Sequence, residues 1–154
     1  FAFSVILNLK AQGVPDEDIV PIMMADYGLE LYGNSIMVNT NFADENPEVV
    51  EAMLRALAKG FADAVADPAA GAAAVVAAND ILDIGIETER LTMANEMNIN
   101  TAYVQENGFG GIDFDRLDRA IAQLGTSIGI SSDISAADVF DDSYLPPAEE
   151  RMFE

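Results

Sequence analysis

The chain has 154 residues, of which 51% are hydrophobic, and its 27 acidic and 7 basic residues give a formal net charge of −20. A surface this negative repels phosphate backbones and anionic lipids, so we expect neither nucleic-acid binding nor binding to a membrane surface. Because the sequence contains no Cys and no His, these residues offer no disulfide, Cys/His zinc site, thiol nucleophile or histidine acid–base catalyst. No stretch reaches the roughly 18 consecutive apolar residues of a membrane span, which predicts a soluble domain with a core of its own.

The first quarter of the chain predicts one helix and two strands. Residues 1–12 fit both strand alternation and helical periodicity, but the Gly and Pro that follow are a helix-stop signal and favour the helix. Two apolar runs, VPIMM at 20–24 and SIMV at 35–38, are bounded by Gly, Pro and Asn. Short apolar runs with such boundaries are typical of buried strands. We therefore expect two strands that flank the polar segment ADYGLELYGN at 25–34.

The remainder of the chain predicts helices that begin at capping residues. Two of them show an Asn or Asp followed directly by Pro at the first helical position. The predicted caps are Asn46, Asp67, Asp83 and Asp113, with predicted ends near Asp67, Asn79, residue 98 and Gly125. Residues 101–113 predict a turn-rich connection, and ISAADVF at 134–140 predicts one short helix. Few strands followed by many helices indicate one part of an α/β protein.

The polar segment 25–34 holds the best candidates for ligand contact. Tyr27 and Tyr32 could stack on a planar heterocycle, and the amide of Asn34 could pair with ring nitrogens. Asp26 could hold a ligand amine through a charge-assisted hydrogen bond. In the alternative interpretation both tyrosines pack at a strand end, and Asn34 only adopts a turn beside its neighbouring glycine.

A second, weaker group lies in the predicted connection, where Tyr103, Gln105 and Asn107 occur among glycines. Arg116 and Arg119 are expected to pair with acidic residues of their own helix, Asp113 or Asp115. No spacing of carboxylates or glycines matches a calcium loop or a dinucleotide fingerprint, so no metal and no cofactor is expected.

Several motifs together resemble one protein family. They are YGN before an expected strand, the run ENPEVV, the helix RALAKGFADAVADP, ETERL, and the ending DVFDDSYLPP. In this combination the chain resembles the substrate-binding proteins of ABC importers, in the subgroup of nitrate, sulfonate, taurine and thiamine-pyrimidine-precursor binders. The resemblance extends over nearly the whole chain.

The resemblance implies an α/β fold, as the helix-rich C-terminal portion of a two-lobed periplasmic-binding-protein-like (type II) protein. Residues 1–38 would form the end of the second lobe with its hinge strand, and residues 39–154 the helical C-terminal part of the first lobe. The implied function is non-enzymatic capture of a small molecule, such as a thiamine pyrimidine precursor or related nitrogen heterocycle. The molecule would be delivered to an ABC permease subunit, which places the protein in the periplasm or outside the cell.

Two alternatives remain at this point. Some relatives are thiamine-pyrimidine biosynthetic enzymes whose chemistry needs a reactive His, a Cys-rich motif and iron, and this chain has neither residue type. The other alternative is a non-catalytic interaction module. Because half of a two-lobed fold would expose apolar surface, we expect residues 1–154 alone to form a homo-oligomer.

Overall fold

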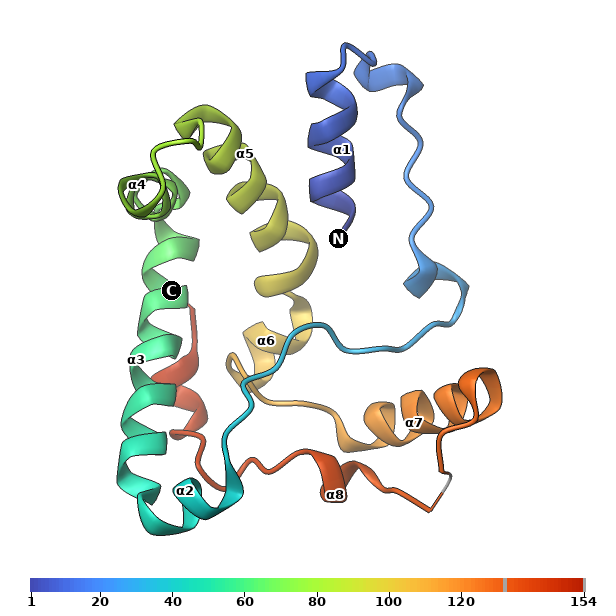
Figure 1. Ribbon diagram of the computed structural model, residues 1–154, viewed down its shortest axis with the longest axis vertical. Helices are drawn as coiled ribbons and strands as arrows, with labels where there is room; N and C mark the ends of the chain where they lie inside the picture. The colour runs from blue at the N-terminus through green and yellow to red at the C-terminus, as the bar shows by residue number, and fades with distance from the viewer. Residues whose placement is uncertain (132, 154) are drawn as a thin grey trace. The chain divides into compact units, whose positions relative to one another are not determined.

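The computed structural model describes residues 1–131 and 133–153, and it is built from helices joined by coil (Figure 1). The chain forms two compact units, and α3 contributes to both of them. The first unit comprises Phe1–Pro21, Arg55–Gly110 and the C-terminal residues from Pro146 onward. The second comprises Ile22–Leu54 and Gly111–Leu145.

The α-helices have the following bounds: α1 Ala2–Ala11, α2 Thr40–Glu45, α3 Pro47–Ala66, α4 Pro68–Ala78, α5 Ile84–Ala94, α6 Ala102–Asn107, α7 Phe114–Ile128 and α8 Ala136–Val139. Shorter turns are 3₁₀-helical at Asp16–Asp18, Met24–Tyr27 and Ala148–Arg151, and π-helical at Asn95–Ile99.

The prediction of an α/β fold is wrong, because no strand occurs within residues 1–131 and 133–153. The expected strands at 20–24 and 35–38 lie between α1 and α2, where Figure 1 draws no arrow: residues 20–23 and 35–38 are coil, and Met24 opens a 3₁₀ turn. Two short strands make only a marginal sheet in water, and Pro21 lacks the amide hydrogen that a strand ladder needs. Between the two runs, backbone groups of residues 28–31 hydrogen-bond to side chains of α7 instead of to a neighbouring strand.

The capping signals at Asp67, Asp83 and Asp113 located the starts of α4, α5 and α7 correctly. The carboxylate of Asp67 accepts from the amide of Ala70 at 3.0 Å, and Asp83 and Asp113 cap α5 and α7 in the same way. Such a bond satisfies one of the amides that the first helical turn leaves unpaired. The predicted end at Gly125 is wrong: α7 continues to Ile128, and the chain leaves it at Gly129 with a φ of 73°. A positive φ suits glycine, which explains why Gly129 rather than Gly125 ends the helix.

Two helices occur where none was expected. Asn39, expected to flank a strand, accepts at its side chain from the amide of Phe42 and caps α2. Thr101 caps α6 through the amide of Val104, so the supposed turn-rich connection begins with six helical residues. Both are helices of only six residues with a good N-cap, and a period of 3.6 residues is hard to recognise over six positions.

In the first unit, α4 and α1 both pack against α5. Gly71 lets α4 approach closely, because a Cβ atom there would lie 2.7 Å from Leu91 Cδ2 and 3.3 Å from Ala64 Cβ. A separate aromatic cluster joins three segments, with the ring of Phe109 at 4.4 Å from that of Phe61 and at 5.4 Å from that of Phe153.

In the second unit, α7 buries one face that includes Ala120 and Ile121. The rings of Phe114 and Phe140 meet edge to face, and Asp118 accepts from the amide of Ala136 at the start of α8, at 2.7 Å. The helical period of the sequence places Leu117, Ile121 and Leu124 on one apolar face, and Ile121 of that face is buried. On α3, by contrast, the apolar periodicity of the sequence places Met53 on the same face as Val50 and Leu54, yet Met53 is 56% exposed.

In the part of the chain that the structure describes, no single helix is both long and apolar enough to cross a membrane. Helices α3 and α4 meet those criteria of length and composition only as a pair, and that pair is bent by 116°.

Candidate ligand-binding site

The polar segment after the 3₁₀ turn Met24–Tyr27 is fixed to α7 by one glutamine. The amide nitrogen of Gln123 donates to the carbonyl of Gly28 at 2.7 Å, and its amide oxygen accepts from the backbone of Glu30 at 3.3 Å. One side chain therefore takes the place of a neighbouring strand for these two residues. Because donor and acceptor are both used, the orientation of the Gln123 amide is fixed by its partners.

Arg116 fixes the same segment about two turns nearer the start of α7. Its guanidinium donates to the carbonyls of Glu30 and Leu31, each at 3.1 Å, and lies 4.2 Å above the centre of the Tyr32 ring. The phenol oxygen of Tyr32 accepts from the amide of Asp113 at 2.9 Å, at the N-cap of α7. The Tyr32 ring is thus occupied by a guanidinium, and its hydroxyl by the backbone.

A salt bridge adds a third contact between the segment and α7. Arg119 donates through Nε and Nη2 to the two carboxylate oxygens of Glu30. This hydrogen bond to Arg119 lowers the pKa of Glu30 and raises that of Arg119. We expected Arg116 and Arg119 to pair with acidic residues of their own helix. Their guanidinium groups instead donate to the segment at Glu30 and Leu31.

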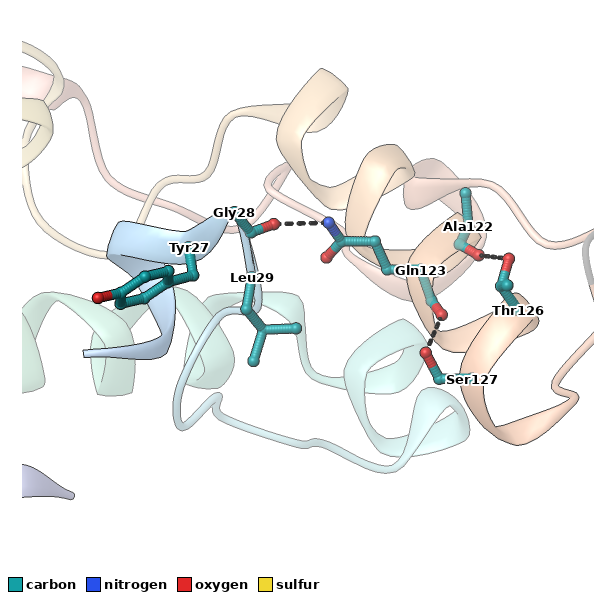
Figure 2. A pocket seen from close by; sticks show the side chains of 7 residues that line it. All are labelled: Tyr27, Gly28, Leu29, Ala122, Gln123, Thr126 and Ser127. Atoms are coloured by element: carbon teal, nitrogen blue, oxygen red, sulfur yellow. Dashed lines mark hydrogen bonds between the residues drawn. The ribbon is translucent and has the colours of Figure 1, made fainter. Parts of the chain in front are cut away.

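An open hollow of about 520 Å³ lies where this segment meets α7. It is lined by Tyr27, Gly28, Leu29, Ala122, Gln123, Thr126 and Ser127 (Figure 2). All seven residues belong to the second unit, and none of them is charged. Figure 2 shows Tyr27 and Leu29 on the 3₁₀ side, with the polar side chains of the helix opposite.

The hydroxyl donors that α7 contributes to the hollow are used internally. The hydroxyl of Thr126 donates to the carbonyl of Ala122 at 3.1 Å, and that of Ser127 donates to the carbonyl of Gln123 at 2.8 Å. Their oxygen lone pairs remain available as acceptors. Together with the ring of Tyr27, which is 79% exposed, the hollow offers an aromatic face and hydroxyl acceptors. Such a surface suits a planar ligand that carries N–H groups.

The structure separates the four residues that the sequence proposed for ligand contact. Only Tyr27 lines the hollow, and Tyr32 is engaged by Arg116 and Asp113. Asp26 and Asn34 are exposed, within the 3₁₀ turn and in the coil after Tyr32. The weaker group of Tyr103, Gln105 and Asn107 lies on α6, in the first unit.

Sequence reasoning missed the side of the hollow that α7 provides. Gln123, Thr126 and Ser127 recur at helical spacing on one face, largely opposite the apolar face of the same helix. A helical projection could have identified this polar stripe, but not the segment that it holds. Among the described residues no group of three or more acidic side chains is arranged to hold a metal ion.

The family model described as NMT1/THI5 like matches residues 4–71 of the chain. Residues 4–71 are NMT1/THI5-like. The match confirms the family resemblance inferred from the sequence, over the part of the chain from α1 to the first turn of α4. No curated protein and no solved structure matches the chain.

The NMT1/THI5-like region includes Asp26, Tyr27, Tyr32 and Asn34 and ends well before α7. The family includes substrate-binding proteins, which are not enzymes, but also a biosynthetic member. The match is consistent with a solute-binding role for ABC transporters. It also suggests a periplasmic or extracellular location.

Proposed function

We propose that this chain is part of a solute-binding component of an ABC-type importer that captures a small nitrogen heterocycle and delivers it to a permease. The observation that carries the proposal is the NMT1/THI5-like match, because it includes Tyr27, the aromatic wall of the hollow. Asp26, Tyr32 and Asn34 belong to the proposed ligand-contact set on sequence grounds, and Tyr27 is the member that the hollow supports.

The ligand class follows from charge and hydrogen bonding. The net charge of −20 disfavours anionic solutes, and the uncharged hollow supplies no cation to bind one. Acceptor lone pairs beside an aromatic ring favour a neutral or cationic molecule with N–H donors, such as an aminopyrimidine of the thiamine-precursor type. The proposal also includes two lobes that hold the ligand, with residues 1–38 at the end of the second lobe and residues 39–154 in the first. It places the protein in the periplasm or outside the cell.

The test is a thermal-shift series with the protein as its gene encodes it, against aminopyrimidines, other amines, sulfonates and nitrate. We expect a rise in Tm with an amine-bearing heterocycle and none with the anions, because a ligand that binds only the folded state stabilises it. Tyr27→Ala should raise the Kd about fivefold, since aromatic stacking contributes roughly 1 kcal/mol.

Met37→Ala is the matched control, because Met37 is 91% exposed in the same unit and lies outside the hollow. An equal loss of binding in both variants would contradict a site at Tyr27. A lack of stabilisation by every solute in the series would contradict the binding function itself. Turnover of the heterocycle, rather than retention, would favour the biosynthetic branch of the family.

A further inference from the structure

A buried asparagine lies where three helices of the first unit meet. Asn95 follows α5 and opens the π-helical turn, in which the amide of Asn100 donates to the carbonyl of Asn95 at 2.8 Å. Asn95 is only 7% exposed, in a molecule whose other amides lie mainly at the surface. Single π-helical turns are uncommon and frequently mark sites with a specific role.

One end of this side chain completes α3. The carbonyl of Ala64 would, in a continuous helix, accept from the amide of residue 68, but residue 68 is proline and has no amide hydrogen. Asn95 Nδ2 donates to that carbonyl at 3.2 Å. This hydrogen bond lies at the junction between α3 and α4, where the chain bends by 116°.

The hydrogen bond to Ala64 also identifies the second polar atom of the Asn95 side chain. A carbonyl can only accept, so the atom that faces Ala64 must be the amide nitrogen, which identifies the remaining atom as Oδ1. Asn95 Oδ1 is buried and has no partner among the described residues. A buried acceptor left without a donor costs roughly 1–3 kcal/mol, which a native fold normally avoids with a protein group or a water molecule.

We propose that Asn95 is a two-ended connector: Nδ2 supplies the donor that Pro68 lacks, and Oδ1 binds one internal water molecule at the α3–α4–α5 junction. A water molecule fits the chemistry because it can donate to Oδ1 and brings no charge into the interior. The carbonyl of Ala64, which accepts from Nδ2, keeps a second lone pair, and the proposal assigns the other hydrogen of the water to it. The connector is independent of the proposed ligand site, which lies in the second unit.

The direct test uses the unaltered chain labelled with ¹⁵N. Water-to-amide cross-relaxation measured by NMR should show a long-lived water at the Asn95 side-chain amide, and no such water at the exposed Asn107. Asn107 Nδ2 makes the same kind of bond, to the carbonyl of Tyr103 at 3.0 Å, on the surface of α6. A dry Asn95 amide would overturn the water site.

Matched substitutions test the buried connector. Asn95→Leu should lower Tm by about 5 °C or more, whereas Asn107→Leu should change it by about 1 °C or less. Asn95→Asp should lower Tm most at pH 8 and least near pH 4, because burial raises the folded pKa and only the protonated carboxyl can donate to Ala64. Asn107→Asp carries the same charge change and should show no such pH dependence. Equal losses at the two positions would refute the connector.

Discussion

At the scale of single residues, Arg116 decides what Tyr32 can do. The guanidinium covers the tyrosine ring and also donates to two backbone carbonyls of the segment beside it. A ring that is already stacked on a cation offers less surface to a ligand, whereas the exposed ring of Tyr27 is open. The structure therefore assigns different roles to two tyrosines that have similar sequence surroundings.

We expect Arg116→Lys to destabilise the second unit by about 1–3 kcal/mol, because an ammonium cannot reproduce a fork that donates to two carbonyls. Urea unfolding followed by tyrosine fluorescence would measure the loss. Arg119→Lys is the control on the same helix: its salt bridge to Glu30 is exposed, and its replacement should have little effect. A larger loss at Arg119 than at Arg116 would show that the salt bridge, rather than the backbone contacts, holds the segment.

At the scale of elements, two interior glycines of neighbouring helices have opposite surroundings. A Cβ atom at Gly60 of α3 would meet nothing within 4 Å, whereas one at Gly71 of α4 would meet Leu91 and Ala64. Glycine lowers helix stability in both positions, but only Gly71 permits a close approach between helices.

Gly60→Ala should therefore stabilise the first unit by about 0.5–1 kcal/mol, through helix propensity. The Gly71→Ala variant should be less stable than the Gly60→Ala variant by about 1–3 kcal/mol in free energy of unfolding. The added methyl group at position 71 must displace Leu91 and crowd Ala64. Thermal unfolding by circular dichroism at 222 nm compares the two variants directly. Equal gains at both sites would mean that α4 and α5 separate at no measurable cost.

At the scale of the whole molecule, the apolar runs that predicted strands remain largely uncovered. Their exposed large side chains are Val20, Ile22, Met24, Ile36, Met37 and Val38. A coil this apolar is a favourable surface for association, but copies that each carry a net charge of −20 repel one another.

We expect the 154-residue chain to self-associate, and to do so more strongly in 1 M NaCl than in 20 mM NaCl. Salt reduces the Debye length from about 20 Å to about 3 Å and so screens the repulsion between copies. Light scattering at several protein concentrations would report the mass. The paired substitution Ile36→Ser with Met37→Ser should reduce association at high salt. A monodisperse monomer under both conditions would contradict the prediction.

The amino-acid sequence by itself located the starts of α4, α5 and α7 and indicated the NMT1/THI5-like resemblance of residues 4–71. Caps at Asp67, Asp83 and Asp113 act within one turn of chain, so local chemistry is sufficient to place them. The motifs from α1 to α4 likewise indicated the NMT1/THI5-like family without any coordinates. What the sequence could not determine was the conformation of residues 20–38, because an apolar run becomes a strand only if another strand pairs with it.

Only the tertiary structure decided which groups pair with that segment. Gln123, Arg116 and Arg119 are separated from residues 28–32 by more than 80 positions, and no local pattern announces such contacts. They satisfy the backbone of the segment from α7, leave the Tyr27 ring exposed beside Thr126 and Ser127, and cover Tyr32. Helix ends are set by neighbours in the chain, whereas the candidate site is set by hydrogen bonds between distant residues, and only folding brings those residues together.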